Sequence, residues 1–189
     1  MVKEEIKLRG YLGEAVVKQW LNRKYPSEEK YSIVSQIIPR DVPKKGGGYL
    51  DFGVIKNEAV VAVYEVKTWD YIFSDNDLNH ALKYLWKNTE KELSFDVQDS
   101  VTYSGRNVKT CLVLLAPPNE KGIQTIGEDN IRNHNVILFA DILDELGDID
   151  VNAIINDIKP LIKKEIENIR KIRTGKTFLP KFNKLRSKF

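Results

Sequence analysis

The chain has 189 residues, of which 42% are hydrophobic and 30% charged, and its net charge is +3. This composition is too apolar for a disordered chain, and the length suits one domain over 1–189 rather than two. Every apolar run is shorter than the roughly 20 residues of a membrane-spanning helix, which argues against a membrane partner, and the single cysteine, Cys111, excludes an internal disulfide and favours a cytoplasmic setting.

The apolar residues recur with helical or strand periodicity along most of the chain. In chain order, the first half predicts a helix over 2–24, strands over 31–38, 49–55 and 59–68, and a helix over 74–94. The second half predicts a loop or short edge element over 96–107, strands over 108–116 and 135–140 with a short helix within 123–132, and a helix over 151–173. This order predicts an α/β fold, a mixed sheet of about five strands flanked by helices.

The positive charge is concentrated at the C-terminal end. Residues 159–189 contain eleven Lys or Arg and two Glu, a net charge of +9, whereas residues 1–158 carry a net charge of −6. A basic helix and tail over about 151–189 would attract phosphate backbones. A solvated helix face followed by a frayed tail explains the same pattern.

Two charged residues end the third predicted strand. Side chains alternate along a strand, so Glu65 and Lys67 share one face with the valines that precede them. Charges that follow an apolar run must reach solvent or find partners, because isolated buried charges are very costly. The strand before it offers such a partner in Asp51.

The turn between these strands sets their register. A three-residue turn at 57–59 would pair Lys56 with Val60 and place Asp51 opposite Glu65. Directly opposite residues have Cβ atoms about 4.5 to 5.5 Å apart, so the two carboxylates would repel each other. The repulsion is relieved if one of them is protonated or if a cation lies between them.

Oxygen ligands in such a pair suit a hard cation. Mg²⁺ is the first candidate and Mn²⁺ the second, with the backbone carbonyl of Val66 as a further ligand. Charged residues also end strands by chance, so solvent-exposed side chains or a degenerate site remain open as alternatives.

The first predicted helix carries Gly10, Gly13 and Glu14. A glycine in a helix interior costs about 1 kcal/mol relative to alanine, so something should compensate for two of them. Close packing of this helix against the sheet would do so, and would bring Glu14 near the two strand carboxylates. An ordinary exposed glutamate is the alternative.

These residues together resemble a known family. Asp51, thirteen further residues and then Glu65-Val66-Lys67, after a helix with Gly13-Glu14, look like the PD-(D/E)XK nuclease superfamily and its restriction-endonuclease-like fold. The resemblance covers about residues 8–86 and includes nuclease-related and Holliday-junction-resolvase-like branches, without separating them. Leu50 stands where the motif has its proline.

The resemblance implies a Mg²⁺- or Mn²⁺-dependent endonuclease, a hydrolase that cuts nucleic-acid phosphodiester bonds, DNA more readily than RNA. It assigns metal binding and catalysis to Asp51, Glu65 and Glu14, and assigns to Lys67 the orientation of the attacking water or the stabilisation of the phosphorus centre. A symmetric cut in a duplex needs two active sites, so a homodimer would suit this activity. The candidate nucleic-acid-binding residues are Lys44 and Lys45 beside a run of three glycines, Lys83, and Lys176 in the basic tail.

Two other functions remain open. The chain could be a nucleic-acid-binding module that kept the nuclease fold without its activity. It could also be an interaction subunit whose helix over 151–173 binds another protein.

Overall fold

The computed structural model describes residues 3–42, 48–68, 78–97, 101–133 and 135–174, with 3–7 and 165–174 described by their backbone alone. The chain divides into two compact units, residues 1–149 and 150–189. Within the described residues, no helix has both the length and the apolar character needed to cross a membrane.

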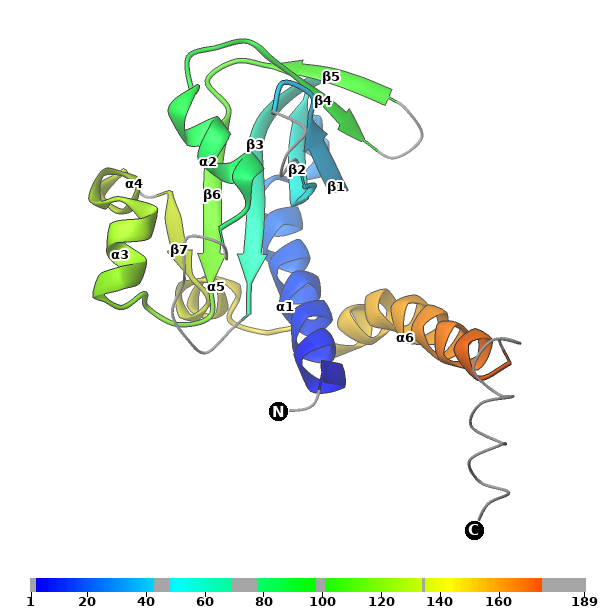
Figure 1. Ribbon diagram of the computed structural model, residues 1–189. Helices are drawn as coiled ribbons and strands as arrows, with labels where there is room; N and C mark the ends of the chain where they lie inside the picture. Colours follow the sequence, from blue (N-terminus) through cyan, green and yellow to red (C-terminus); the bar gives the residue numbers. More distant parts are fainter. Residues whose placement is uncertain (1–2, 43–47, 69–77, 98–100, 134, 175–189) are drawn as a thin grey trace. The chain divides into compact units, whose positions relative to one another are not determined.

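The described residues of the first unit form a seven-stranded mixed sheet with helices around it (Figure 1). The strands are β1 (Tyr31–Pro39), β2 (Leu50–Lys56), β3 (Ala59–Lys67), β4 (Leu93–Val97), β5 (Val101–Gly105), β6 (Lys109–Leu114) and β7 (Val136–Leu138). The helices are α1 (Lys3–Lys24), the 3₁₀ turn η1 (Ser27–Glu29), α2 (His80–Lys87), α3 (Glu120–Ile126), α4 (Glu128–Arg132) and α5 (Phe139–Leu146). The second unit contains α6 (Val151–Thr174), which runs through Pro160 as one helix.

The α/β class and the mixed sheet are confirmed, but the sheet is not a simple open one. Strands β2, β1, β4, β5 and β3 are neighbours in that order, and β2 also pairs with β3, so these five strands close into a barrel. Strands β6 and β7 continue from β3 in parallel. Two of the contacts that close the ring are short: β1 meets β4 through two residue pairs, and β3 meets β5 through one.

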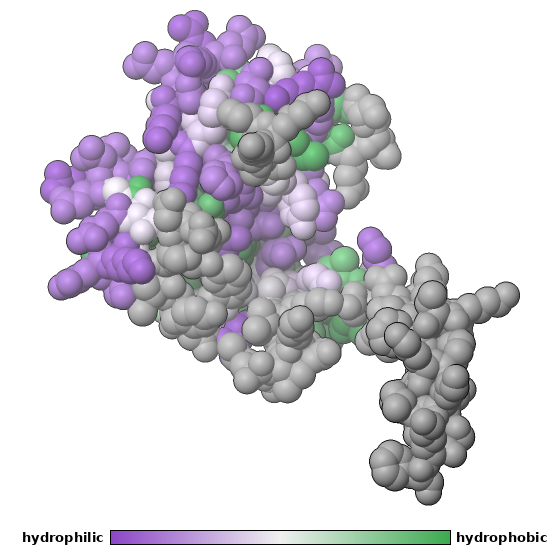
Figure 2. Space-filling view, viewed as in Figure 1, coloured by the Kyte–Doolittle hydropathy of each residue, from purple (hydrophilic) through white to green (hydrophobic). Residues whose placement is uncertain are grey.

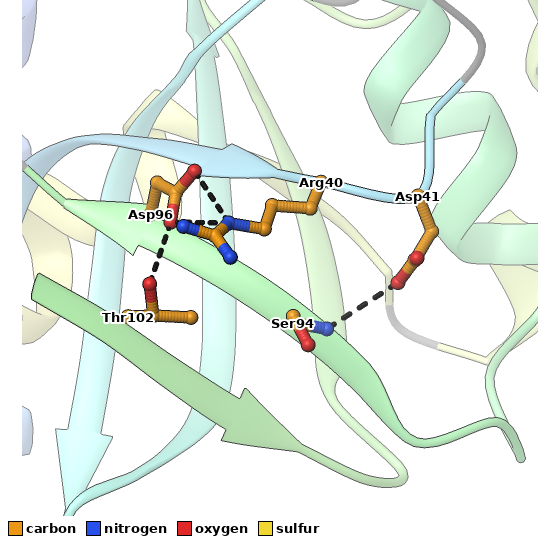
Figure 3. Close-up of polar contacts among 5 residues, drawn as sticks. All are labelled: Arg40, Asp41, Ser94, Asp96 and Thr102. Carbon is orange, nitrogen blue, oxygen red and sulfur yellow. Dashed lines mark hydrogen bonds and ion pairs between the residues drawn. The ribbon is translucent and has the colours of Figure 1, made fainter. Parts of the chain in front are cut away.

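The junction of β1 with β4, called here the β1–β4 seam, is reinforced by side chains (Figure 3). The Arg40 Nε lies 2.7 and 2.8 Å from the two carboxylate oxygens of Asp96, and the Thr102 hydroxyl donates to the same carboxylate at 2.9 Å. The Arg40 N–H donates to the Ser94 carbonyl, and the Ser94 N–H donates to the Asp41 carboxylate. The Arg40 guanidinium lowers the pKa of Asp96.

Strand β3 lies between two helical layers. Tyr64 is fully buried, and its ring meets the edge of Trp20 from α1, with the ring centroids 5.8 Å apart. Its neighbour Val63 points to the opposite face, where it joins a core that includes Leu82 and Leu85 of α2. Strand β3, whose end carries the predicted site, therefore runs between α1 and α2 (Figure 1).

The expectation of about five strands was too low. The helix predicted to reach residue 94 ends at Lys87, and the β4–β5 hairpin occupies the region where a helix end and a loop or short edge element were expected. Leu93 and Phe95 are buried on β4, and because they alternate with polar residues they follow strand rather than helix periodicity. Likewise, the strand predicted to end at residue 140 ends at Leu138, where α5 begins.

Candidate active site

The register between β2 and β3 is the predicted one, although the turn is different. The turn has two residues, Asn57 and Glu58, with φ values of 50° and 64°, and pairs Lys56 with Ala59. A register shift further along restores the expected pairing, so that β2 and β3 align as Phe52 opposite Tyr64. An extra residue in one strand of a pair is a β-bulge, and here it offsets the missing turn residue.

Continued by one residue beyond the Phe52–Tyr64 pair, this register places Asp51 opposite Glu65. Glu65 is only 3% exposed, which is rare for a carboxylate. Its Oε1 atom lies 2.7 Å from the Lys67 Nζ, and the Lys67 side chain is 19% exposed. The two charges that sequence alternation placed on one face of β3 are thus a largely buried ion pair.

Asp51 is held close to this pair. Its Oδ2 atom accepts a hydrogen bond of 2.6 Å from the backbone N–H of Val66. Burial, followed by the negative charge of Glu65, raises the pKa of Asp51 to about 8; Glu14 adds to this effect, while Val66 N–H and Lys67 oppose it. The two strand carboxylates therefore interact strongly, as the register predicts.

Glu14 approaches from α1. Burial raises its pKa, and the negative charge of Glu65 raises it further, while Lys67 acts in the opposite direction. The preceding residue explains the approach: a Cβ on Gly13 would lie 2.2 Å from the Thr68 Cγ2, so α1 rests on the end of β3 at a glycine. Among the described residues, Gly10 has no such neighbour within 4 Å, so the close-packing explanation finds no support at that position.

The donor set fits a hard divalent cation in kind. The negative charge of Glu65 contributes to the raised pKa of Asp51 and of Glu14, while Lys67 lowers the pKa of both and pairs directly with Glu65. Carboxylate oxygens are the ligands that Mg²⁺ and Mn²⁺ prefer. Yet in the described part of the chain no group of three or more His, Cys, Asp or Glu side chains is placed to hold a metal ion. The Lys67 ammonium and the Val66 N–H contact carboxylate oxygens that a metal would need.

The structure gives less information on the remaining predicted site residues. The predicted role of the Val66 carbonyl stays a prediction, since only the Val66 N–H has a described contact with the site. Lys83 is half-buried on α2. Lys44, Lys45 and Lys176 lie outside the described residues.

One residue of the site had no assigned role in the sequence analysis. Asn79 is the N-cap of α2, and its amide nitrogen lies 3.4 Å from the Glu65 Oε2. The signal was an asparagine directly before the apolar run of a helix. Asn79 was not recognised as an N-cap because the helix was predicted to begin at residue 74, five residues before it.

Comparisons of the chain with protein-family models, with curated proteins and with solved structures found no match.

Proposed function

We propose that this chain is a metal-dependent nuclease that hydrolyses phosphodiester bonds, and that DNA is its substrate rather than RNA. The observation that carries the proposal is the buried carboxylate of Glu65, with the ammonium of Lys67 and the carboxylate of Asp51 beside it at the end of β3. A purely structural ion pair would not need two further carboxylates beside it whose pKa values are raised by burial and by the charge of Glu65. Strongly perturbed carboxylates are common at catalytic sites.

In the proposed reaction, Asp51, Glu65 and Glu14 hold Mg²⁺ or Mn²⁺. When bound, this ion supplies positive charge to the phosphate and lowers the pKa of a bound water. Lys67 donates hydrogen bonds from its ammonium to the attacking water or to a phosphate oxygen. It is already within the site, 2.7 Å from Glu65.

The arrangement of elements supports kinship with the restriction-endonuclease-like fold. An antiparallel unit of β1, β2 and β3 continues through the parallel strand β6, and α1 and α2 lie on the two faces of β3. The closed ring of five strands departs from the open sheet that the resemblance implies. The kinship is therefore part of the proposal.

A plasmid-nicking assay tests the activity. The wild-type chain should nick supercoiled DNA in Mg²⁺ or Mn²⁺ and lose this activity in EDTA, and Asp51→Asn and Glu65→Gln should each reduce the rate by at least about 100-fold. The matched control is Glu58→Gln, which makes the same carboxylate-to-amide change in the exposed turn of the same hairpin and should leave the rate unchanged. Folding of each variant is checked by circular dichroism.

Nicking that persists in EDTA, or that survives both substitutions, would exclude the proposal. A structured RNA of equal length, assayed in parallel, decides between the two nucleic acids: faster cleavage of RNA would overturn the choice of DNA.

A non-catalytic nucleic-acid-binding module is the second candidate. It is favoured by the Lys67–Glu65 ion pair, which balances the charge of Glu65 without a metal. It is also favoured by the charge of the second unit, whose residues 150–189 carry eleven basic and four acidic side chains, a net charge of +7. Tight, salt-sensitive DNA binding without cleavage, unchanged in Asp51→Asn, would support this candidate.

A protein-interaction subunit is favoured by α6, where Val151 and Ile155 are 60% and 53% exposed. The face of the molecule drawn in Figure 2 is largely hydrophilic over the coloured part of the first unit, so that face offers a protein partner little apolar surface. A homodimer through α6 would also supply the two sites that a duplex cut needs. Light scattering on the purified chain, compared with Ile155→Lys, decides whether α6 joins two copies.

A further inference from the structure

The side-chain amide of Asn79 connects three segments of the first unit. Its Oδ1 atom accepts a hydrogen bond of 2.9 Å from the Ala81 N–H and so caps α2. Its Nδ2 atom donates to the Tyr49 carbonyl at 2.9 Å and, more weakly, to the Glu65 Oε2 at 3.4 Å. One amide therefore contacts the start of a helix, the approach to β2 and the end of β3.

The contact with Glu65 gives the second oxygen of this buried carboxylate a hydrogen-bond donor. Lys67 holds one oxygen of Glu65, and Asn79 is the described donor to the other. Because an unsatisfied buried oxygen is costly, these two donors fix the rotation of the carboxylate about its last side-chain bond.

The contact with Tyr49 acts on the other strand. Tyr49 is two residues before Asp51, and a hydrogen bond to its carbonyl restrains the backbone that enters β2. Gly48 lies against the same amide, because a Cβ at that position would be 3.4 Å from the Asn79 Nδ2. The amide thus restrains the start of β2, where Asp51 lies.

From this arrangement we propose that Asn79 is a positioning residue that sets the distance and orientation of the Glu65 carboxylate relative to Asp51, and thereby sets the affinity of the site for a divalent cation. Residues that hydrogen-bond to metal ligands typically change metal affinity by about 10- to 100-fold when they are replaced. The inference rests on the proposed metal-dependent function.

Asn79→Ser separates the two roles of the side chain. Serine is also a preferred N-cap, so α2 keeps its cap, while the amide donor to Glu65 and Tyr49 is lost. The chain offers a matched control in Asn119→Ser, because Asn119 caps α3 by accepting from the Gly122 N–H at 2.9 Å and has no described contact with the site.

Calorimetric titration of the full-length chain with Mn²⁺ alone provides the test. Asn79→Ser should bind Mn²⁺ at least about 10-fold more weakly than wild type, and Asn119→Ser should bind as wild type does. In the nicking assay, Asn79→Ser should raise the Mn²⁺ concentration that gives half the maximal rate and should recover most of that rate at saturating Mn²⁺. A loss of helix stability alone would not produce this difference between the two caps.

The outcomes separate the two proposals. If wild type binds Mn²⁺ and Asn79→Ser binds it equally well, the role of Asn79 is wrong and the metal site stands. If wild type binds no Mn²⁺, the proposed function fails, and the role of Asn79 fails with it. Equal weakening in both cap variants would assign the effect to capping and would also overturn the inference.

Discussion

A buried aspartate with a strongly raised pKa makes the stability of a protein depend on pH. The pKa of Asp51 is about 8 in the folded chain, against an ordinary value of 3.8. Between these two values the folded state binds more protons than the unfolded state. Stability should therefore decrease as pH rises through this window in the absence of a divalent cation.

Asp51→Asn tests this directly. An amide carries no charge at any pH, so the variant should be more stable than wild type at pH 8, by an amount on the order of a few kcal/mol, and the advantage should shrink towards pH 4. Urea unfolding measured at several pH values in EDTA gives the comparison. A constant difference across the range would show that the ionisation of Asp51 is not coupled to folding.

At the residue scale, the sequence predicted which side chains meet but not how they meet. Glu65 and Lys67 share a face because side chains alternate, and the register with Asp51 follows from the length of the hairpin. The two-residue turn and the bulge were not predictable from spacing, because the shorter turn shifts the register by one residue and the bulge shifts it back. The role of Asn79 depends on where α2 begins, and helix starts are among the least certain features of a sequence-based assignment.

At the scale of elements, α1 and β3 meet through a glycine. Gly13→Ala should destabilise the fold by about 1 to 3 kcal/mol, because its Cβ would overlap the Thr68 side chain. Gly10→Ala, in the same helix but with no described atom within 4 Å of the added Cβ, should instead stabilise by up to about 1 kcal/mol. Thermal unfolding followed by circular dichroism measures both.

A double variant identifies the cause. Thr68→Ser removes the Cγ2 atom that lies 2.2 Å from the alanine Cβ position, so Gly13→Ala with Thr68→Ser should recover much of the lost stability. If the two substitutions are simply additive, the loss does not come from this contact.

The longer elements were predicted well. Helix α1, strands β1 to β3 and β6, and helix α6 each have a pattern long enough to identify within a few residues. Strand β4 was missed because Leu93 was assigned to the apolar stripe of the preceding helix, and β5 lies where a loop or short edge element was predicted; only contacts with distant strands identify the pair as a hairpin of the sheet. The same long-range pairings produce the ring, which no local pattern contains.

At the scale of the whole molecule, charge is divided unequally. Residues 1–149 carry a net charge of −4 and residues 150–189 a net charge of +7. If the second unit holds the phosphate backbone, replacing Lys163 and Lys164 with Glu should weaken DNA binding and flatten its dependence on salt by about two ion equivalents or more. Fluorescence anisotropy at salt concentrations from about 50 to about 200 mM measures how steeply DNA affinity falls with salt.

Lys87→Glu on α2, combined with Lys121→Glu on α3, is the matched control because it makes the same charge change on exposed helical residues of the first unit. An equal loss of affinity in both pairs would mean that net charge, and not the basic second unit, controls binding.

Closure of the barrel also bears on the solubility of partly opened molecules. While the β1–β4 seam is intact, β7, which has three residues, forms the outer end of the strand order in the described sheet. Opening the seam would expose backbone N–H and C=O groups of two more strands, and such edges recruit strands from other molecules. Arg40→Ala removes the ion pair between Arg40 and Asp96. This variant should therefore aggregate faster than wild type on mild heating, which turbidity measures.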